Sequence, residues 1–304
     1  MLADTHVHLS YPLFDQIFTY IEMKDGEFIA TQNGNREELI SKMKEQGIEF
    51  IIEPAIDVDS NKRLISLSKK YDDFVFGAVG NHPTRTINSS FRDFKRVREF
   101  AEAEREIIVG IGETGLDYHY ERKKQHRLKQ KIWFQYQINL ADKLELPLIL
   151  HIREANKDAI KILRRNKNKL HGGVCHCFSS GSDVSKIYTE ELGLCLGIGA
   201  TILKNETISA PLKDAVKKTK LESLLIETDG PYVKAPRPVR NPDSPDYISK
   251  KKWERARNTS LILPAVIEKI AEIKEMSPKE VERITHENAL RVFKKISIKK
   301  ETGD

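Results

Sequence analysis

Short apolar runs alternate with longer amphipathic stretches along most of the chain. The apolar runs are rich in β-branched residues and are bounded by turn-forming residues, which is typical of buried strands. Eight strands are predicted, at residues 2–7, 48–56, 74–80, 107–113, 147–150, 173–177, 192–198 and 224–227. Amphipathic helices are predicted at residues 35–47, 60–71, 90–105, 122–144, 155–165 and 211–218.

This alternation predicts a single-domain parallel (β/α)8 barrel of the TIM type, an α/β fold. A chain of 304 residues could hold two average domains, but barrels of this size commonly form one. After the eighth strand, helices are predicted at residues 261–275, from the capping pair Ser277 and Glu280, and at 285–294. The sequence shows no fixed-period repeat and no second domain. Residues 1–298 are therefore assigned to the barrel and 299–304 to a disordered tail.

Two segments depart from the barrel pattern. Residues 10–35 carry five aromatic residues, which we expect to pack a loop onto the barrel mouth, although they could also stack on bases. Residues 234–257 hold four prolines and eight Lys or Arg, with Tyr247 and Trp253 interleaved. A solvated loop is the default interpretation of such a stretch. The sharper alternative is an electrostatic clamp on phosphates, centred on the run Lys250–Lys252.

Composition and charge narrow the class of protein. With 39% hydrophobic and 32% charged residues, the chain should be soluble and globular. No apolar run reaches eighteen residues and no signal-like leader precedes the first strand, so a cytoplasmic location is expected. The three cysteines suit a reducing compartment, and Cys175 and Cys177 should face the surrounding helices as packing thiols. A net charge of +6 is compatible with a nucleic-acid partner without requiring one. No stable protein partner is predicted, and a monomer is favoured.

Polar residues of metal-binding types stand at the ends of several predicted strands. Glu113 follows a buried apolar run, where a charge is costly unless it is paired or bound to a metal. It could also cap backbone N–H groups in a tight turn. His6 and His8 lie two residues apart on a strand and should point to the same side. The fifth, sixth and eighth strands end in His151, His176 and Asp229. Because strand ends form one ring in a barrel, these six residues should converge on a metal site.

The ordered motifs resemble the TatD family of metal-dependent hydrolases and deoxyribonucleases, within the amidohydrolase-like superfamily. They are DTHVHL from Asp4, GNHP from Gly80, IGETGLDY from Ile111, LPLILHIREA from Leu146, HCF from His176, ETDGPYV from Glu227 and THENALRVF from Thr285. Together they cover nearly the whole chain in the family's order, which makes the resemblance specific.

The resemblance implies a ligand set for two divalent ions. One ion would be held by His6, His8, Glu113 and Asp229. Glu113 would bridge to the second ion, held also by His151 and His176. Positions near the substrate phosphate would be occupied by His82, Arg153, Arg257 and Asn258. From the residues alone, His82 beside Pro83 is as consistent with a structural role as with a ligand or substrate role. Residues 10–35 and 234–257 look longer than in the family, so substrate preference is the property carried over least directly.

This ligand set is suited to activating a water and clamping a phosphodiester, with Glu113 and Asp229 as catalytic residues. Imidazole ligands suit Zn, Mn, Fe or Co, whereas Mg prefers oxygen. The leading prediction is therefore a two-metal deoxyribonuclease with DNA as substrate. A barrel amidohydrolase cleaving a C–N or ester bond is the alternative. A lysine at the fourth strand end would favour that alternative, but Glu113 stands there. A binding protein with a decayed site is a third reading, disfavoured because the ligand set is complete.

Overall fold

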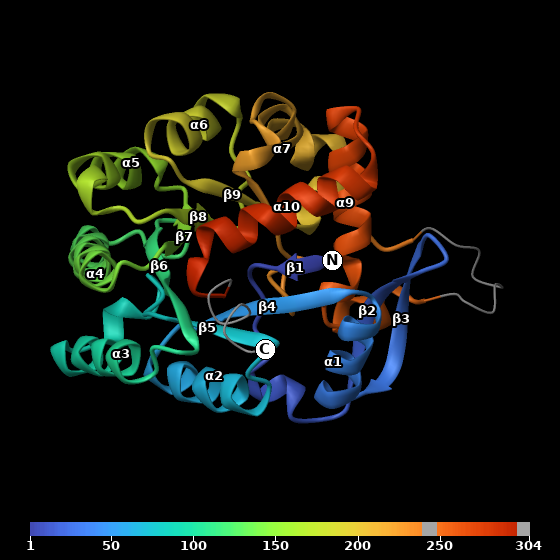
Figure 1. Ribbon diagram of the computed structural model, residues 1–304, viewed down its shortest axis with the longest axis horizontal. Coiled ribbons are helices and arrows are strands. Elements are labelled where there is room, and N and C mark those ends of the chain that lie inside the picture. Colours follow the sequence, from blue (N-terminus) through green and yellow to red (C-terminus); the bar gives the residue numbers. More distant parts are fainter. Residues whose placement is uncertain (239–247, 297–304) are drawn as a thin grey trace.

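Eight parallel strands form one sheet that curves round on itself, with helices outside it (Figure 1). The computed structural model describes residues 1–238 and 248–296. The strands follow one another around the sheet in chain order. They are β1 (Leu2–Asp4), β4 (Ile48–Pro54), β5 (Val75–Val79), β6 (Ile108–Asp117), β7 (Leu148–Arg153), β8 (Gly173–Cys175), β9 (Cys195–Ile198) and β10 (Leu224–Ile226). The predicted barrel is confirmed.

Polar contacts just beyond the ends of β1 and β10 bring the two edges of the sheet together. The backbone N–H of Thr5 donates to the carbonyl of Ile226 at 3.2 Å. The fully buried carboxylate of Asp4 accepts from the backbone N–H of Thr228 at 3.1 Å and from the hydroxyl of Ser260 at 2.6 Å. A buried charge is costly unless it is hydrogen-bonded, so these contacts also satisfy Asp4.

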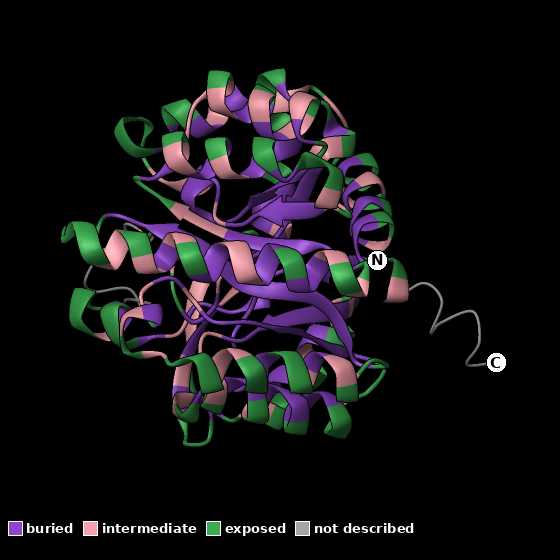
Figure 2. Ribbon diagram, turned by 90° about the vertical axis from the view of Figure 1, so that its left-hand side faces the viewer, coloured by how far each residue is buried: buried purple, intermediate pink, exposed green. Residues whose placement is uncertain are grey.

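The helices fill the intervals between strands and expose their outer faces (Figure 2). They are α1 (Arg36–Glu45), α2 (Val58–Lys70), α3 (Phe91–Ala103), α4 (Lys124–Leu144), α5 (Asn156–Arg165), α6 (Ser182–Lys186), α7 (Glu206–Lys218), α8 (Lys250–Arg255), α9 (Leu263–Lys274) and α10 (Pro278–Val292). The predicted cap Asn35 accepts from the N–H of Glu38 at 2.9 Å. The prediction of two separate helices after residue 276 was wrong, since one continuous helix, α10, spans this region. Neither glycine nor proline occurs in residues 279–294 to end a helix there.

The interior of the barrel is an apolar cluster to which all eight strands contribute. Its members include Phe50, Phe76 and Ile149, and Phe293 beyond the end of α10 packs into the same cluster. Side chains alternate along a strand, so the residues two positions after Ile149 and Val174 also face inward. Those residues are histidines. The fold therefore continues its apolar interior into a polar layer at the carboxyl ends of the strands.

Most of residues 10–35 form a hairpin, at residues 18–34, and not the expected loop. Strands β2 (Phe18–Lys24) and β3 (Glu27–Gly34) pair in antiparallel register. Their turn has positive φ at Asp25 (50°) and Gly26 (79°), the type I′ pattern that Asp-Gly favours. Four of the segment's five aromatic residues are buried, namely Tyr11, Phe14, Phe18 and Tyr20. Packing is therefore confirmed for these four, and they are not free to stack on bases.

The described parts of residues 234–257 are also packed, contrary to the solvated-loop interpretation. Trp253 of α8 is 5% exposed and lies in a cluster with Ile21 of β2, Ala235 and Ile248. This burial removes Trp253 as a base-stacking residue. Residues 239–247, which include Tyr247, and the predicted tail lie outside the described residues. Among the helices that are described, none combines the length and apolarity needed to span a membrane.

Candidate metal centre

A pocket of about 540 Å³ opens at the carboxyl ends of the strands. The ring of residues predicted from the strand ends meets here. His8, Glu113, His151, His176 and Asp229 line the pocket, and His6 lies buried beneath them. Their elements are far apart in the sequence, but barrel topology places the strand ends side by side. The structure therefore brings all six predicted ligands together.

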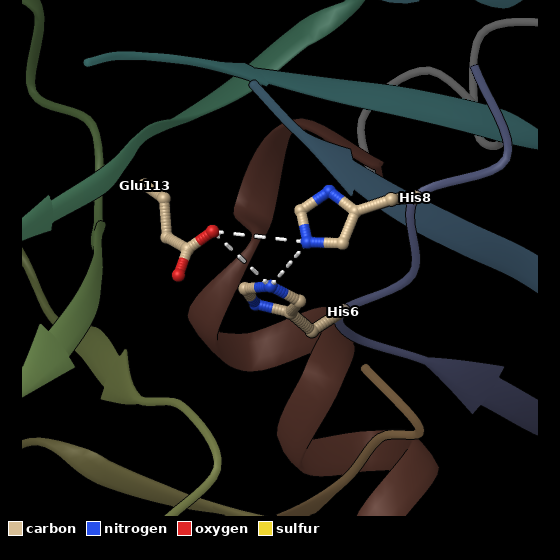
Figure 3. Close-up of side chains that lie close together, drawn as sticks. All are labelled: His6, His8 and Glu113. Carbon is tan, nitrogen blue, oxygen red and sulfur yellow. Dashed lines mark hydrogen bonds and ion pairs between the residues drawn. The ribbon is translucent and has the colours of Figure 1, made fainter. Parts of the chain in front are cut away.

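His6 and His8 point toward one carboxylate oxygen of Glu113 (Figure 3). Their Nε2 atoms are 3.3 Å apart, and each lies 3.7 Å from Glu113 Oε2. His8 Nδ1 lies 3.1 Å from the carbonyl oxygen of Pro54, which can only accept. Nδ1 therefore carries a hydrogen, and Nε2 of His8 is the nitrogen that faces Glu113 and can bind a metal once it is deprotonated. Asp229 joins this group, with its Oδ1 3.5 Å from His8 Nε2.

The other oxygen of Glu113 faces a second pair of imidazoles. Oε1 lies 3.0 Å from His151 Nδ1 and 2.8 Å from His176 Nε2, and these two nitrogens are 3.1 Å apart. The opposite nitrogen of His151 lies 2.9 Å from Asp117 Oδ2. Asp117 thus holds a hydrogen on Nε2 of His151 and leaves Nδ1 as the nitrogen that can bind a metal once it is deprotonated. One carboxylate stands between two groups of potential ligands.

Two carboxylates that support the site were missed in the sequence. Asp117 is the last residue of β6, since that strand runs four residues past its predicted end at Glu113. Glu113 and Asp117 are four residues apart, and on one continuous strand this even spacing puts both side chains on the same face. A longer predicted strand would therefore have identified Asp117. Glu53 accepts hydrogen bonds from the N–H and hydroxyl of Ser10 and fixes the chain just after His8. Nothing in the local sequence indicated that partner.

The four predicted substrate contacts fall into two pairs. His82 and Arg153 line the pocket. Arg257 instead lines a separate groove beside the hairpin. Asn258 is fully buried, and its amide donates to the carbonyls of Thr228 (2.9 Å) and Val233 (3.3 Å). Asn258 therefore holds the chain beneath the pocket and is not placed to touch a substrate.

The match to known proteins decides the family. Residues 3–294 match the model of the family described as TatD related DNase. The chain belongs to the TatD family. The resemblance drawn from the motifs, to metal-dependent hydrolases of this type, is thereby confirmed.

Relatives of the TatD family cover almost the whole chain. The uncharacterized metal-dependent hydrolase YabD of Bacillus subtilis is 32% identical over 295 residues, covering 97% of this chain and 99% of YabD. The 3'-5' ssDNA/RNA exonuclease TatD of Yersinia pseudotuberculosis is 29% identical over 262 residues, covering 84% of this chain and 92% of that protein. The crystal structure of YJJV, a TatD homolog from Escherichia coli K12, has a TM-score of 0.75 at 23% identity, covering 96% and 98% of the two chains. That structural match shows the shared fold.

The distances between the imidazole nitrogens and the Glu113 oxygens are those expected for ligands of divalent ions. Two donors about 2.1 Å from one ion lie about 3.4 Å apart in a tetrahedral arrangement and about 3.0 Å apart in an octahedral one. The contacts around Glu113 Oε2 span 3.3 to 3.7 Å, and those around Oε1 span 2.8 to 3.1 Å. His82 also lies near, but the backbone N–H of Thr84 donates to its Nδ1, so its Nε2 carries the hydrogen and offers no lone pair.

Two of the imidazoles take up protons in the metal-free protein. Burial disfavours the charged form of His8, but the hydrogen bond to Asp229 and the charge of Glu113 outweigh it and raise the pKa of His8 to about 9. Burial opposes charge on His151 as well. There the hydrogen bonds to Asp117 and Glu113 raise the pKa to about 9. Both rings are therefore charged at neutral pH and balance the carboxylates.

His6 and His82 stay neutral. Burial and the neighbouring His176 lower the pKa of His6 to about 4. Burial and the neighbouring His151 lower the pKa of His82 to about 3. A neutral His82 with its hydrogen on Nε2 can donate to an anionic oxygen, and this nitrogen lies 3.4 Å from Glu113 Oε1.

Metal binding at pH 7 is expected to release about two protons, because a metal binds neutral imidazole and both His8 and His151 must deprotonate. Observed affinity should fall about tenfold per displaced proton for each unit of pH below 9, and should level off above it. Calorimetry in buffers of different ionisation enthalpy measures the proton count. Binding without proton release at pH 7 would contradict these assignments.

Proposed function

We propose that this protein is a metal-dependent phosphodiesterase that hydrolyses DNA using a pair of divalent cations. The observation that carries the proposal is the position of Glu113. Its two oxygens face different ligand groups, His6 and His8 on one side and His151 and His176 on the other. A bridging carboxylate between two mixed ligand sets is the arrangement that two-metal hydrolases use.

Each group of residues would hold one cation. His6, His8 and Asp229 would complete one site with Glu113, and His151 and His176 would complete the other. Imidazole-rich sites favour Zn, Mn, Fe or Co over Mg. Cations bound here would acidify a water molecule and offset the charge of the scissile phosphate.

Asp229 would accept the proton of the attacking water. Burial opposes its charge, but the hydrogen bond to His8 and the nearby imidazoles hold the pKa of Asp229 below its usual value. Asp229 is thus ionised and able to take a proton. His82, which lines the pocket, would donate its Nε2 hydrogen to a phosphate oxygen. The exposed guanidinium of Arg153 lies at the pocket rim, where it would offset phosphate charge.

A nucleic-acid substrate is supported by the relatives named as ssDNA/RNA exonucleases and by the basic character of the chain. The alternative is an amidohydrolase that cleaves a C–N or ester bond of a small molecule, since a two-metal site also supports that chemistry. A cytoplasmic location and a monomeric state remain predictions.

The deciding experiment is an assay of metal-reconstituted protein against single-stranded DNA, duplex DNA, RNA and a panel of small esters and amides. The proposal expects cleavage of at least one DNA substrate, abolished by chelation and restored by Mn²⁺, Co²⁺ or Zn²⁺. Turnover of amides or esters with no cleavage of any nucleic acid would establish the alternative.

Replacing Lys250, Lys251 and Lys252 with alanine tests the clamp predicted from the sequence. Lys250 and Lys251 are exposed at the start of α8. If they contact phosphates, each lost contact should flatten the dependence of log affinity on log salt by about 0.7 for single strands. Binding of single-stranded DNA across a salt series measures this slope. An unchanged slope would leave α8 as a packed element with a solvated face.

A further inference from the structure

A second group of basic residues lies beside the pocket, at the start of α4. Residues 122–131 hold seven Lys, Arg or His. The later cations are engaged: Lys129 donates to the carbonyl of Ile87 at 2.8 Å, and Lys131 pairs with Asp158 at 2.6 Å. The first three, Arg122–Lys124, are exposed. We call these three residues the basic segment.

Within residues 1–238 and 248–296, the side chains of the basic segment have no acceptor, although the backbone N–H of Lys123 donates to Glu121 Oε1 at 3.1 Å. The adjacent carboxylate, Glu121, pairs with His126 at 2.8 Å. The first turn of α4 contains no acidic residue, and no side chain caps its N-terminus. Cations at a helix N-terminus oppose the helix dipole and cost stability. Unpaired cations at the N-terminus of α4 are therefore unfavourable for the helix. Residues that are locally unfavourable and have no compensating contact often serve a function.

An exposed aromatic ring connects the basic segment to the pocket. Tyr120 lines the pocket, two residues before Arg122, and is 69% exposed. The guanidinium of Arg153 lies over the Tyr120 ring, 4.9 Å from its centroid. The His119 ring also contacts Tyr120, with 4.9 Å between centroids, yet most of Tyr120 stays exposed and offers a surface for a stacked base.

Asp117 ties this ring to the candidate metal centre. One oxygen of its carboxylate accepts from the backbone N–H groups of His119 and Tyr120, both at 3.0 Å. The other oxygen lies 2.9 Å from His151 Nε2. The turn that carries Tyr120 is therefore held by the same side chain that orients a proposed metal ligand. The pocket and the aromatic ring form one fixed surface.

We propose that Tyr120 and the basic segment form a track for single-stranded nucleic acid leaving the metal pocket. A base next to the scissile phosphate stacks on Tyr120, and the following phosphates lie on Arg122, Lys123 and Lys124. The track rests on the proposed function, since it binds the part of a strand that the pocket does not hold. It makes affinity depend on strand length.

The test compares two variants that lose the same charge. R122Q/K123Q/K124Q removes the basic segment. K161Q/R165Q/K167Q also removes one Arg and two Lys, all exposed, from α5 and the turn after it, which leads to the amino-terminal end of β8. Binding of metal-loaded protein to phosphorothioate oligothymidylates, which resist hydrolysis, is measured by anisotropy for lengths of about 4 and about 16 nucleotides. The salt range is about 50 to 200 mM.

For the longer strand, the slope of log affinity against log salt concentration should be shallower by about 2 in R122Q/K123Q/K124Q than in wild type. This value is the sum of three lost phosphate contacts of about 0.7 each. The affinity of this variant should fall on the order of tenfold or more, while the α5 variant keeps the wild-type slope. Equal slopes for wild type and R122Q/K123Q/K124Q would overturn the track, and so would equal losses in both variants. Failure of wild type to cleave any DNA substrate would overturn the proposed function itself, which separates the two ideas.

Tyr120 is tested independently of charge. Y120A should weaken binding of the longer strand about tenfold, whereas Y120F and Y120W should retain it, because stacking needs only an aromatic face. Equal affinity of Y120A and wild type would remove the stacking contact from the track. Weakening of Y120F as severe as that of Y120A would also do so, since it would assign the effect to the hydroxyl.

Discussion

Glu113→Ala is expected to lower turnover by about 10³-fold or more and to reduce bound metal from two ions to fewer than one. The reason is that Glu113 contributes an oxygen to both ligand groups, so its loss leaves each group one donor short. Metals held by these residues would supply several kcal/mol of transition-state stabilisation, which sets the scale of the expected loss in rate. Elemental analysis and steady-state kinetics measure the two effects.

A second carboxylate–histidine contact provides the matched control for Glu113. Glu49 lies 2.5 Å from His286, at the amino-terminal end of β4 and away from the pocket. Glu49→Ala should keep both metals and normal turnover, although stability can fall. Full occupancy of two metals in Glu113→Ala would refute the bridging assignment. The isosteric variant Glu113→Gln should lose metal as well, because an amide has only one ligating oxygen and cannot serve both ligand groups, and this result would separate loss of the bridge from cavity formation.

Asp229→Asn is expected to retain most of its metal and to lose turnover by about 10²- to 10⁴-fold, the range for loss of a general base. An amide oxygen can still ligate a cation, but it cannot accept the proton of water at neutral pH. Asp229→Ala should weaken one metal site as well, because it removes the ligand atom. Turnover of Asp229→Asn within about tenfold of wild type would exclude Asp229 as the proton acceptor.

The eight strands and the ring of ligands could be predicted because both follow from local rules. Apolar runs bounded by turn residues located the strands, and parallel barrel topology then required their carboxyl ends to meet. His151 and His176 also follow the alternation of their strands, two residues after the inward-facing Ile149 and Val174. Cys175, between Val174 and His176, faces the outer core with the helices as predicted.

What could not be predicted depends on contacts between distant segments. The Asp25-Gly26 turn was visible in the sequence, but only the packing of the hairpin against Trp253 shows why residues 10–35 are ordered. The roles of Asp117 and Glu53 arise from their partners, which lie 34 and 43 residues away in the chain. Asn258 matched a family position for substrate contact. In the structure its amide instead donates hydrogen bonds to the carbonyls of Thr228 and Val233 and so holds the backbone beneath the pocket.

Anomalous diffraction from crystals of the Mn²⁺- or Zn²⁺-loaded protein tests the central claim most directly. The predicted result is two peaks about 4 Å apart on either side of the Glu113 carboxylate. One peak should lie within bonding distance of His6, His8 and Asp229, and the other within bonding distance of His151 and His176. A single peak at saturating metal, or two peaks that Glu113 does not join, would contradict the account.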